Sequence, residues 1–166
     1  MTRLGVVLLL LVAAPASAQA WTVSNRAVGP VRFGMTMAQA LVATNGRLRI
    51  DDCNDTCCSA SLDGSDDLSF LAEDGIVTRV QVTTPGIRTL SGRGVGDSEA
   101  TIRRAFPGQI RQEPHTYDEN GHYLVFLPRD AADRRETGLI FDTDGQRVTG
   151  VRAGLQPSVG YVEGCY

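Results

Sequence analysis

The chain has 166 residues, 42% of them hydrophobic, and a formal net charge of −3. This composition supports a folded core and excludes wholesale disorder. All 16 basic residues are arginines and no basic stripe stands out, so neither nucleic-acid binding nor an anionic membrane patch is expected. The lack of lysine also excludes Schiff-base and lysine-nucleophile chemistry.

The first 18 residues are typical of a cleaved secretory signal. Arg3 gives a positive start, residues 4–14 form an apolar run, and Ala16-Ser17-Ala18 supplies the small residues that precede a cleavage site. Ala18-Gln19-Ala20 offers a second site. The apolar run is too short to cross about 30 Å of hydrocarbon as a helix, and no cysteine follows it that could carry a lipid anchor. We expect a monomeric protein in the periplasm or secreted, without membrane insertion.

Four cysteines predict two disulfides, because the exported chain meets an oxidising environment. A bridge between the adjacent Cys57 and Cys58 would strain the peptide between them. Cys165 is therefore expected to pair with Cys57 or Cys58, and Cys53 with the other, with Cys57–Cys165 and Cys53–Cys58 preferred. The alternative is a zinc site, but zinc ribbons use reduced Cys-x-x-Cys pairs, which this chain lacks.

Two segments, residues 33–46 and 95–108, match without a gap. In each, a glycine stands two residues before a hydroxyl residue, Thr36 or Ser98, and a second glycine closes the segment. The hydroxyl residues predict helix N-caps, and Thr36 with Gln39 fits a capping box. The closing glycines predict left-handed helix ends. Each segment therefore predicts a short helix.

A second match lies downstream, between residues 70–80 and 140–151, with one extra residue in the second turn. Each segment predicts a strand, an Asp-Gly hairpin turn and a return strand. An earlier hairpin in each half is indicated by the turn signals Asp63-Gly64 and Asn120-Gly121.

Together these matches predict an α+β fold of two tandem repeats, residues 19–85 and 86–166, after the signal peptide at 1–18. Each repeat has one short helix followed by about four antiparallel strands, with the helices on one face of the sheet and the other face free. Residues Pro128 to Thr137 are an insertion, expected to be a solvated loop. Trp21 and Tyr161 are expected to seal the ends of a core formed by Phe33, Leu41, Phe70, Val80, Ile102, Phe106, Phe141 and Val151.

Several segments of the chain resemble small exported bacterial proteins without assigned activity. These segments are residues 85–89, 94–99, 113–117, 121–124 and 161–165. Their helix-plus-sheet unit resembles the repeats of β-lactamase inhibitor protein and of small outer-membrane-assembly lipoproteins. The resemblance implies the tandem fold and a location outside the cytoplasm. From the cysteine pairing, we expect a disulfide-tethered C-terminal tail as part of the second repeat. It carries over no activity, because the inhibitor's binding residues have no matching motif here.

The strongest candidate for a site is the segment from residue 113 to 123, which holds both histidines of the chain. Imidazoles, tyrosines and carboxylates near one turn can bind a ligand or exchange protons, and Tyr117 and Tyr123 would be neighbours across a hairpin. The alternative is a half-exposed hairpin whose polar side chains make only local contacts. The candidate ligand-binding residues are Glu113, His115, Tyr117, His122 and Tyr123.

Other motifs are better explained by structure. Residues 92–96 are rich in glycine before a helix, but they miss the Gly-x-Gly-x-x-Gly fingerprint of phosphate loops. The acidic clusters at 51–55, 63–67 and 142–145 miss the closing glutamate of a calcium loop and fit solvated turns. Nucleophile motifs are absent. We expect no cofactor and no resident metal.

Two hypotheses on function follow. The first is an exported, non-enzymatic binding module that engages a protein or an envelope ligand through its sheet face or loops. The alternative is a small hydrolase or metal-dependent enzyme that uses His115 and His122 with Glu113 or Asp118, which requires both imidazoles to converge within hydrogen-bond reach.

Overall fold

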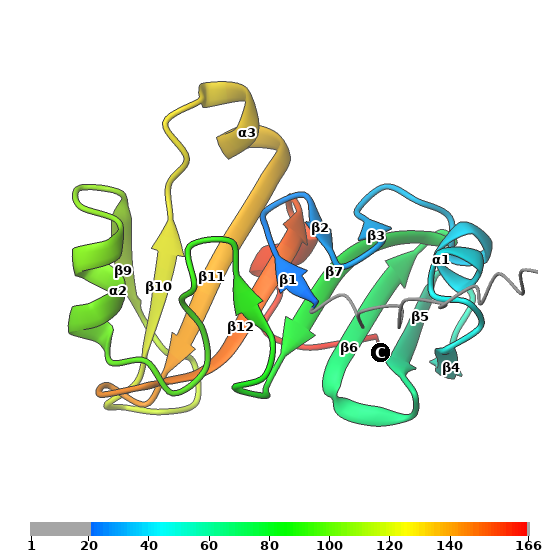
Figure 1. Ribbon diagram of the computed structural model, residues 1–166, viewed down its shortest axis with the longest axis horizontal. Helices are drawn as coiled ribbons and strands as arrows, with labels where there is room; N and C mark the ends of the chain where they lie inside the picture. Colours follow the sequence, from blue (N-terminus) through cyan, green and yellow to red (C-terminus); the bar gives the residue numbers. More distant parts are fainter. Residues whose placement is uncertain (1–20, 166) are drawn as a thin grey trace, which may run out of the picture.

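The computed structural model describes residues 21–165, and the predicted signal peptide lies outside that range. Three α-helices and twelve strands are present in it, and the strands form an eight-stranded and a four-stranded sheet (Figure 1). The predicted α+β class is confirmed. None of the helices in this range is long and apolar enough to span a membrane.

The large sheet is antiparallel throughout and follows the order β4-β5-β6-β7-β12-β11-β10-β9. Four consecutive strands form each half, and the last strand of each half, β7 or β12, lies at the centre. The strands of the large sheet are β4 (Leu48–Cys53), β5 (Cys57–Leu62), β6 (Ser65–Glu73), β7 (Ile76–Val82), β9 (Ile110–Pro114), β10 (His122–Phe126), β11 (Thr137–Thr143) and β12 (Val148–Leu155).

Two short helices, α1 (Met37–Ala43) and α2 (Glu99–Ala105), begin at the predicted caps. The Thr36 hydroxyl accepts from the Gln39 N–H at 3.1 Å, and the Gln39 side chain accepts from the Thr36 N–H at 2.9 Å, which completes the predicted capping box. The Ser98 hydroxyl accepts from the Thr101 N–H in α2. The helices predicted from Thr36 and Ser98 are therefore confirmed.

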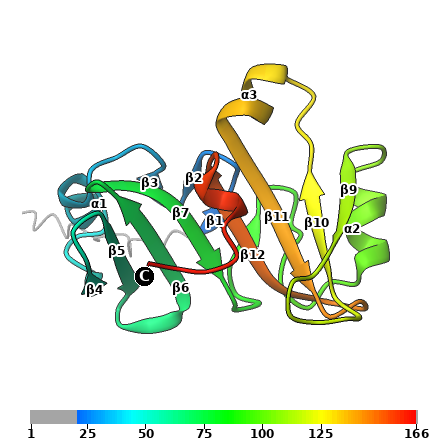
Figure 2. The ribbon, with the colours of Figure 1, turned by 180° about the vertical axis from the view of Figure 1, so that it is seen from behind.

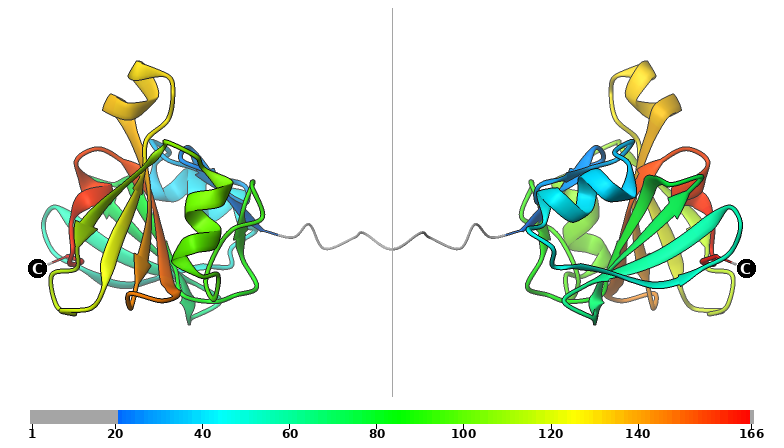
Figure 3. Two further views of the ribbon diagram at one scale, coloured as in Figure 1. Left: turned by 90° about the vertical axis from the view of Figure 1, so that its left-hand side faces the viewer. Right: turned by 90° about the vertical axis from the view of Figure 1, so that its right-hand side faces the viewer.

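Both helices lie on the same side of the large sheet (Figure 3). The main hydrophobic core fills the space between them and the sheet. Seven of the eight residues expected inside belong to it. Five are buried, namely Phe70, Val80, Ile102, Phe141 and Val151, and the partly buried Phe33 and Phe106 pack against them. Leu41 is the exception, with 43% of its surface exposed. In the short helix α1 the buried residue is Ala40 instead, and the neighbouring Leu41 points partly to solvent.

Four two-residue strands form the small sheet, in the order β3-β2-β1-β8, with β1 and β8 parallel. They are β1 (Thr22–Val23), β2 (Ala27–Val28), β3 (Val31–Arg32) and β8 (Arg88–Thr89). Val23, Val28 and Val31 are buried in the main core, and Trp21 packs against it as expected. These strands are too short to produce an alternating pattern in the sequence.

The predicted Asp-Gly turns explain how consecutive strands fold back. Asp63 and Gly64 have φ of 55° and 71°, and Asp74 and Gly75 have 50° and 75°. Positive φ at both central residues is typical of type I′ turns, which match the twist of hairpin strands. Strands β9 and β10 are joined by a longer loop, residues 115–121, in which the Gly121 N–H donates to the Asp118 carbonyl at 3.0 Å.

The insertion is more ordered than expected. Residues Ala131–Glu136 form the third helix, α3, because the Asp130 carboxylate caps it by accepting from the Ala132 and Asp133 N–H groups. Thr137, expected in the solvated loop, is a buried residue that starts β11. The side chains of α3 itself are not buried, so only the helix is solvated as predicted.

The face of the large sheet opposite α1 and α2, which we call the outer face, was expected to be free, and that expectation is wrong. After β12 the chain forms a 3-10 turn, η1 (Ser158–Gly160), and then runs back across this face toward β5 (Figure 2). Val159 of η1 is buried in a small cluster with Tyr123 and Ile140. Gly138 makes this approach feasible, since a Cβ there would lie 2.7 Å from Val159 Cγ1.

Candidate functional site

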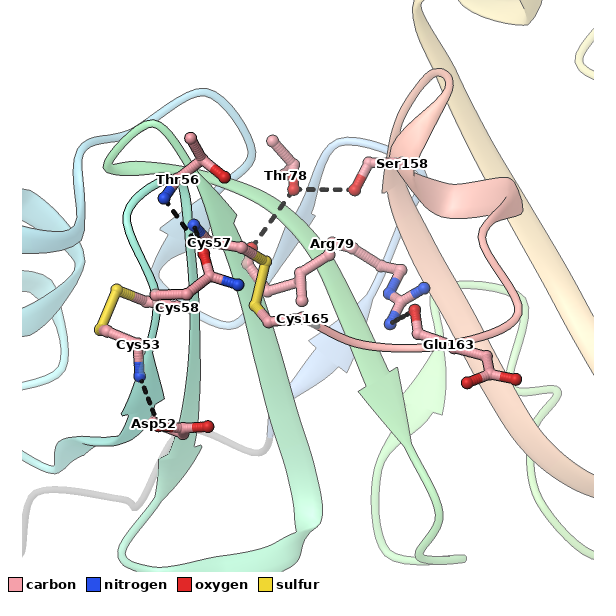
Figure 4. The surroundings of a disulfide bond; sticks show 12 residues. Asp52, Cys53, Thr56, Cys57, Cys58, Thr78, Arg79, Ser158, Glu163 and Cys165 are labelled. Carbon is pink, nitrogen blue, oxygen red and sulfur yellow. Dashed lines mark hydrogen bonds between the residues drawn. A yellow bond between two sulfur atoms is a disulfide. The ribbon is translucent and has the colours of Figure 1, made fainter.

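The candidate site is built around the last residues of the chain. We define the strap as residues Tyr161–Cys165, which follow η1 and cross the outer face (Figures 2 and 4). A disulfide joins Cys165 to Cys57 in β5, 108 residues earlier, and a second joins Cys53 to Cys58. This is the pairing that the sequence favoured. The strap is therefore covalently anchored at its far end.

An irregularity in β7 brings two polar side chains to the strap. Leu71 pairs with Arg79 and Ala72 with Val77, so Thr78 has no opposite residue in β6 and forms a β-bulge. Thr78 and Arg79 consequently both reach the outer face. The Thr78 hydroxyl lies 2.8 Å from the Ser158 hydroxyl in η1.

Two arginines hold the strap through its backbone. Arg79 Nη1 and Arg152 Nη1 donate to the same Tyr161 carbonyl at 2.6 and 2.7 Å, and Arg79 Nη2 donates to the Glu163 carbonyl at 3.1 Å (Figure 4). Only 6% of Arg79 and 3% of Arg152 is exposed. Tyr161, expected to seal one end of the core, is 44% exposed instead, because it is its carbonyl that turns inward.

The two guanidiniums differ in their partners. Arg152 donates from Nε and Nη2 to both carboxylate oxygens of Asp142, at 2.9–3.2 Å. Within residues 21–165 no carboxylate lies at ion-pair distance from Arg79, so its direct partners are strap carbonyls. Burial lowers the pKa of Arg79, and the charge of Arg152 lowers it further. Burial likewise raises the pKa of Asp142, although Arg152 opposes this. The strap carbonyls therefore provide the hydrogen-bond acceptors that the buried Arg79 guanidinium needs.

Beside the strap lies an open groove of about 440 Å³. It is lined by the turn between β4 and β5, by the adjoining ends of β5 and β6, and by the strap. Glu73 is the acidic side chain on the strand side, and none of the described residues that line the groove is basic. The lining residues are Asn54, Thr56, Cys57, Leu71, Glu73 and the five residues of the strap.

The segment predicted as a site is divided between the two faces. Tyr123 is buried on the outer face, where the Arg152 guanidinium lies 4.8 Å from its ring centroid and the His115 ring lies 4.6 Å away. The Tyr123 hydroxyl bonds to Thr116. Tyr117 is 66% exposed, and its ring centroid lies 6.4 Å from that of His115. The structure therefore unites His115 and Tyr123 with the arginine cluster.

The remaining two candidates have other partners. Glu113 of β9 forms an exposed ion pair with Arg111 at 2.7 Å. His122 lies on the helix side of the sheet, where its Nδ1 is 2.7 Å from the Glu99 carboxylate of α2. The same Glu99 oxygen accepts from the Thr143 hydroxyl. The two imidazoles are thus on opposite faces of the sheet and do not converge as an acid–base or metal site would require.

The described residues contain no cluster that could form a metal centre. Among residues 21–165 no group of three or more histidine, cysteine, aspartate and glutamate side chains could hold a metal ion. A wider cavity of about 690 Å³ lies on the other side of the molecule, next to Trp21, with Pro30, Leu62 and Ile87 in its walls. Its arginine, Arg47, is engaged by Asp63.

Sequence reasoning missed Arg79 and Arg152 at the centre of the site, and it wrongly assigned Asp142 to a solvated turn, because Asp142 is buried in β11. The two arginines belong to no motif. Each interrupts a largely apolar strand, as in Val77-Thr78-Arg79-Val80 and Val151-Arg152-Ala153. Charged residues at such positions are rarely buried unless they are paired, and this was the one signal in the sequence that could have revealed the cluster.

Known proteins resemble this chain in fold alone. No protein-family model matches it, and no curated protein matches it in sequence. Its structure is similar to the crystal structure of the uncharacterized protein YfeY from Escherichia coli, with a TM-score of 0.51 and 14% identity over 80% of this chain and 99% of that one. It is also similar to an extracellular protein containing an SCP domain from Bacillus anthracis, with a TM-score of 0.51 and 12% identity over 92% of this chain and 51% of that one.

Proposed function

We propose that the protein is an exported, non-enzymatic binding module that takes an extended segment of a partner protein into the groove beside the strap. The observation that carries this proposal is the groove itself, an open channel of about 440 Å³ with one wall formed by a disulfide-anchored peptide. Loss of the Cys57–Cys165 bridge would free that wall. Two disulfides and the signal-like N-terminus support export to the periplasm or beyond.

The same proposal includes the tandem architecture, with residues 19–85 and 86–166 as two copies of one helix-plus-four-strand unit. Equivalent backbone contacts support it. Each N-cap residue forms an isolated bridge with the start of a returning strand, and the glycine two residues before each cap donates to that strand. The matched pairs are Thr36 with Ile76 and Ser98 with Arg147, then Gly34 with Val77 at 2.9 Å and Gly96 with Val148 at 2.8 Å.

The β-bulges support the duplication further. Thr149 of β12 is the unpaired residue opposite Asp142 and Thr143, as Thr78 is in β7. Their hydroxyls donate to matching carbonyls, Thr78 to Leu71 and Thr149 to Asp142. This alignment makes Asp142 the counterpart of Leu71, and Arg152 the counterpart of Gln81. The two copies therefore differ in chemistry where they meet the strap, as expected if that face acquired the function.

Peptide display tests the proposed function. A library of random hexapeptides is panned against the wild-type protein and against Thr56→Trp, which places an indole in the groove. Thr83→Trp, at an exposed residue just beyond β7, is the matched control. We expect enriched peptides that bind the wild type and Thr83→Trp but not Thr56→Trp. Failure to enrich any peptide, or peptides that bind all three proteins equally, would contradict the proposal.

A further inference from the structure

We infer that the groove selects a cationic segment, one that presents arginine or lysine side chains next to an apolar residue. This inference rests on the proposed function and specifies the partner's chemistry. The first reason is the composition of the walls. Glu73 contributes a half-buried carboxylate, and Thr56 contributes a hydroxyl. The strap adds a peptide backbone, and no arginine of the described chain, residues 21–165, lines the groove.

The second reason is that the nearby cations are already engaged. Arg79 is bound by the Tyr161 and Glu163 carbonyls, and Arg152 by Asp142 and the Tyr161 carbonyl. Both lie beneath the strap with 6% or less of their surface exposed. An incoming carboxylate would find neither guanidinium available and would meet the charge of Glu73. Repulsion by Glu73 therefore disfavours an anionic segment.

The third reason is the pairing state of Glu73. Within residues 21–165 it forms no ion pair, although it lies at the end of β6 beside the groove. The strap already shows how this region binds a guanidinium, since two of its carbonyls accept from Arg79. A guanidinium that enters from the solvent side would combine carbonyl acceptors with the Glu73 carboxylate. Leu71 and Val162 offer apolar surface for the adjoining side chain.

Two synthetic probes test the inference directly. One is a fluorescein-labelled hexapeptide with two arginines and two valines between terminal glycines, and the other carries glutamates in place of the arginines. Fluorescence anisotropy is measured with the oxidised mature chain at low salt. We expect the arginine peptide to bind at least about tenfold more tightly than the glutamate peptide, and to lose affinity as salt is raised, because exposed charges are screened.

Two variants test whether Glu73 is responsible for the tighter binding of the arginine peptide. Glu73→Gln should weaken the arginine peptide by about two- to fivefold, the range for one partly exposed ion pair. Asp67→Asn removes the same charge six residues earlier on the same strand and should leave the affinity unchanged. Equal binding of both peptides, or equal affinities of Glu73→Gln and Asp67→Asn, would overturn the inference.

The outcome of display separates this inference from the proposed function. Peptides that enrich, lose binding to Thr56→Trp and carry no excess of basic residues would overturn the cationic selectivity while leaving the groove as a binding site. A lack of any enriched peptide would instead contradict the binding function itself, whatever the affinity of the two charged probes.

Discussion

On the face toward α1 and α2 the large sheet buries apolar side chains such as Phe70, Phe141 and Leu124, whereas on the outer face it buries two guanidiniums, a carboxylate and a tyrosine ring. The first face is covered by helices that form from local signals. The second is covered by a strap held by a bridge that spans 108 residues. The helix face therefore serves stability, and the outer face combines stability with a surface that can be adapted for binding.

The sharpest test of this difference removes the anchor of the strap. We expect Cys57→Ser with Cys165→Ser to lower the free energy of unfolding by about 5 kcal/mol, because in the chain-entropy model the bridge restrains a very long loop. Cys53→Ser with Cys58→Ser opens a loop of 5 residues and should cost only about 2 kcal/mol. Urea unfolding monitored by circular dichroism measures both. Equal losses would mean that the strap contributes little.

The next effect concerns the buried charges. Asp142→Asn leaves Arg152 buried without its carboxylate, and we expect a loss of about 3–5 kcal/mol in unfolding free energy. Replacing Asp142 with Leu and Arg152 with Gln transfers the chemistry of Leu71 and Gln81 from the first half. This double variant should regain a large part of the lost unfolding free energy, because it removes both buried charges and leaves none without a partner. A double variant as unstable as Asp142→Asn would contradict the proposed equivalence of the halves.

A smaller effect is expected where η1 packs on β11. Gly138→Val would drive a side chain into Val159, and overpacking of this kind costs about 1–3 kcal/mol. Gly164→Val, in the strap, is the control because a Cβ there meets no atom within 4 Å. Thermal unfolding measures both variants. If Gly138→Val were as stable as the control, η1 would move away at little energetic cost, and its packing on the outer face would contribute little to stability.

The smallest effect lies on the helix face and depends on pH. Burial raises the pKa of Glu99, but hydrogen bonds from Thr143, His122 and Arg103 outweigh it, and the net pKa is lowered. The stabilisation is therefore complete above the usual glutamate range and is lost as the pH falls through the lowered pKa. Glu99→Gln should be less stable than the wild type at pH 7, and the difference should shrink below about pH 4.

Urea unfolding at pH 7, 5, 4 and 3 follows this change, with Glu119→Gln, an exposed loop residue, as the control for loss of a charge. A difference between Glu99→Gln and the wild type that stays constant with pH would show that the carboxylate does not depend on its hydrogen-bond donors. The outer-face variant Asp142→Asn would then remain the main probe of buried carboxylates.

Much of the helix face could be predicted because its signals are local. Thr36 and Ser98 mark helix starts, and Asp74-Gly75 marks a turn, through contacts within a few residues. The outer face could not, because Arg79 finds its partners in the strap, more than 80 residues along the chain, and because Arg152 is paired by Asp142 of the neighbouring strand. The β-bulge at Thr78 also breaks the alternation on which strand predictions rely. Similarly, His115 and His122 seemed to form one site because they are close in sequence. Tyr123, next to His122 in β10, points to the opposite face, and His115 lies against Tyr123.

Chemical-shift mapping tests the central claim most directly. The ¹⁵N-labelled mature protein is titrated with the tightest-binding peptide from display. We expect the amide shifts to concentrate on Asn54, Thr56, Leu71, Glu73 and the strap, which together line the groove. Shifts that gather instead around Trp21 and Ile87, at the other cavity, or that spread evenly over the sheet, would contradict binding beside the strap.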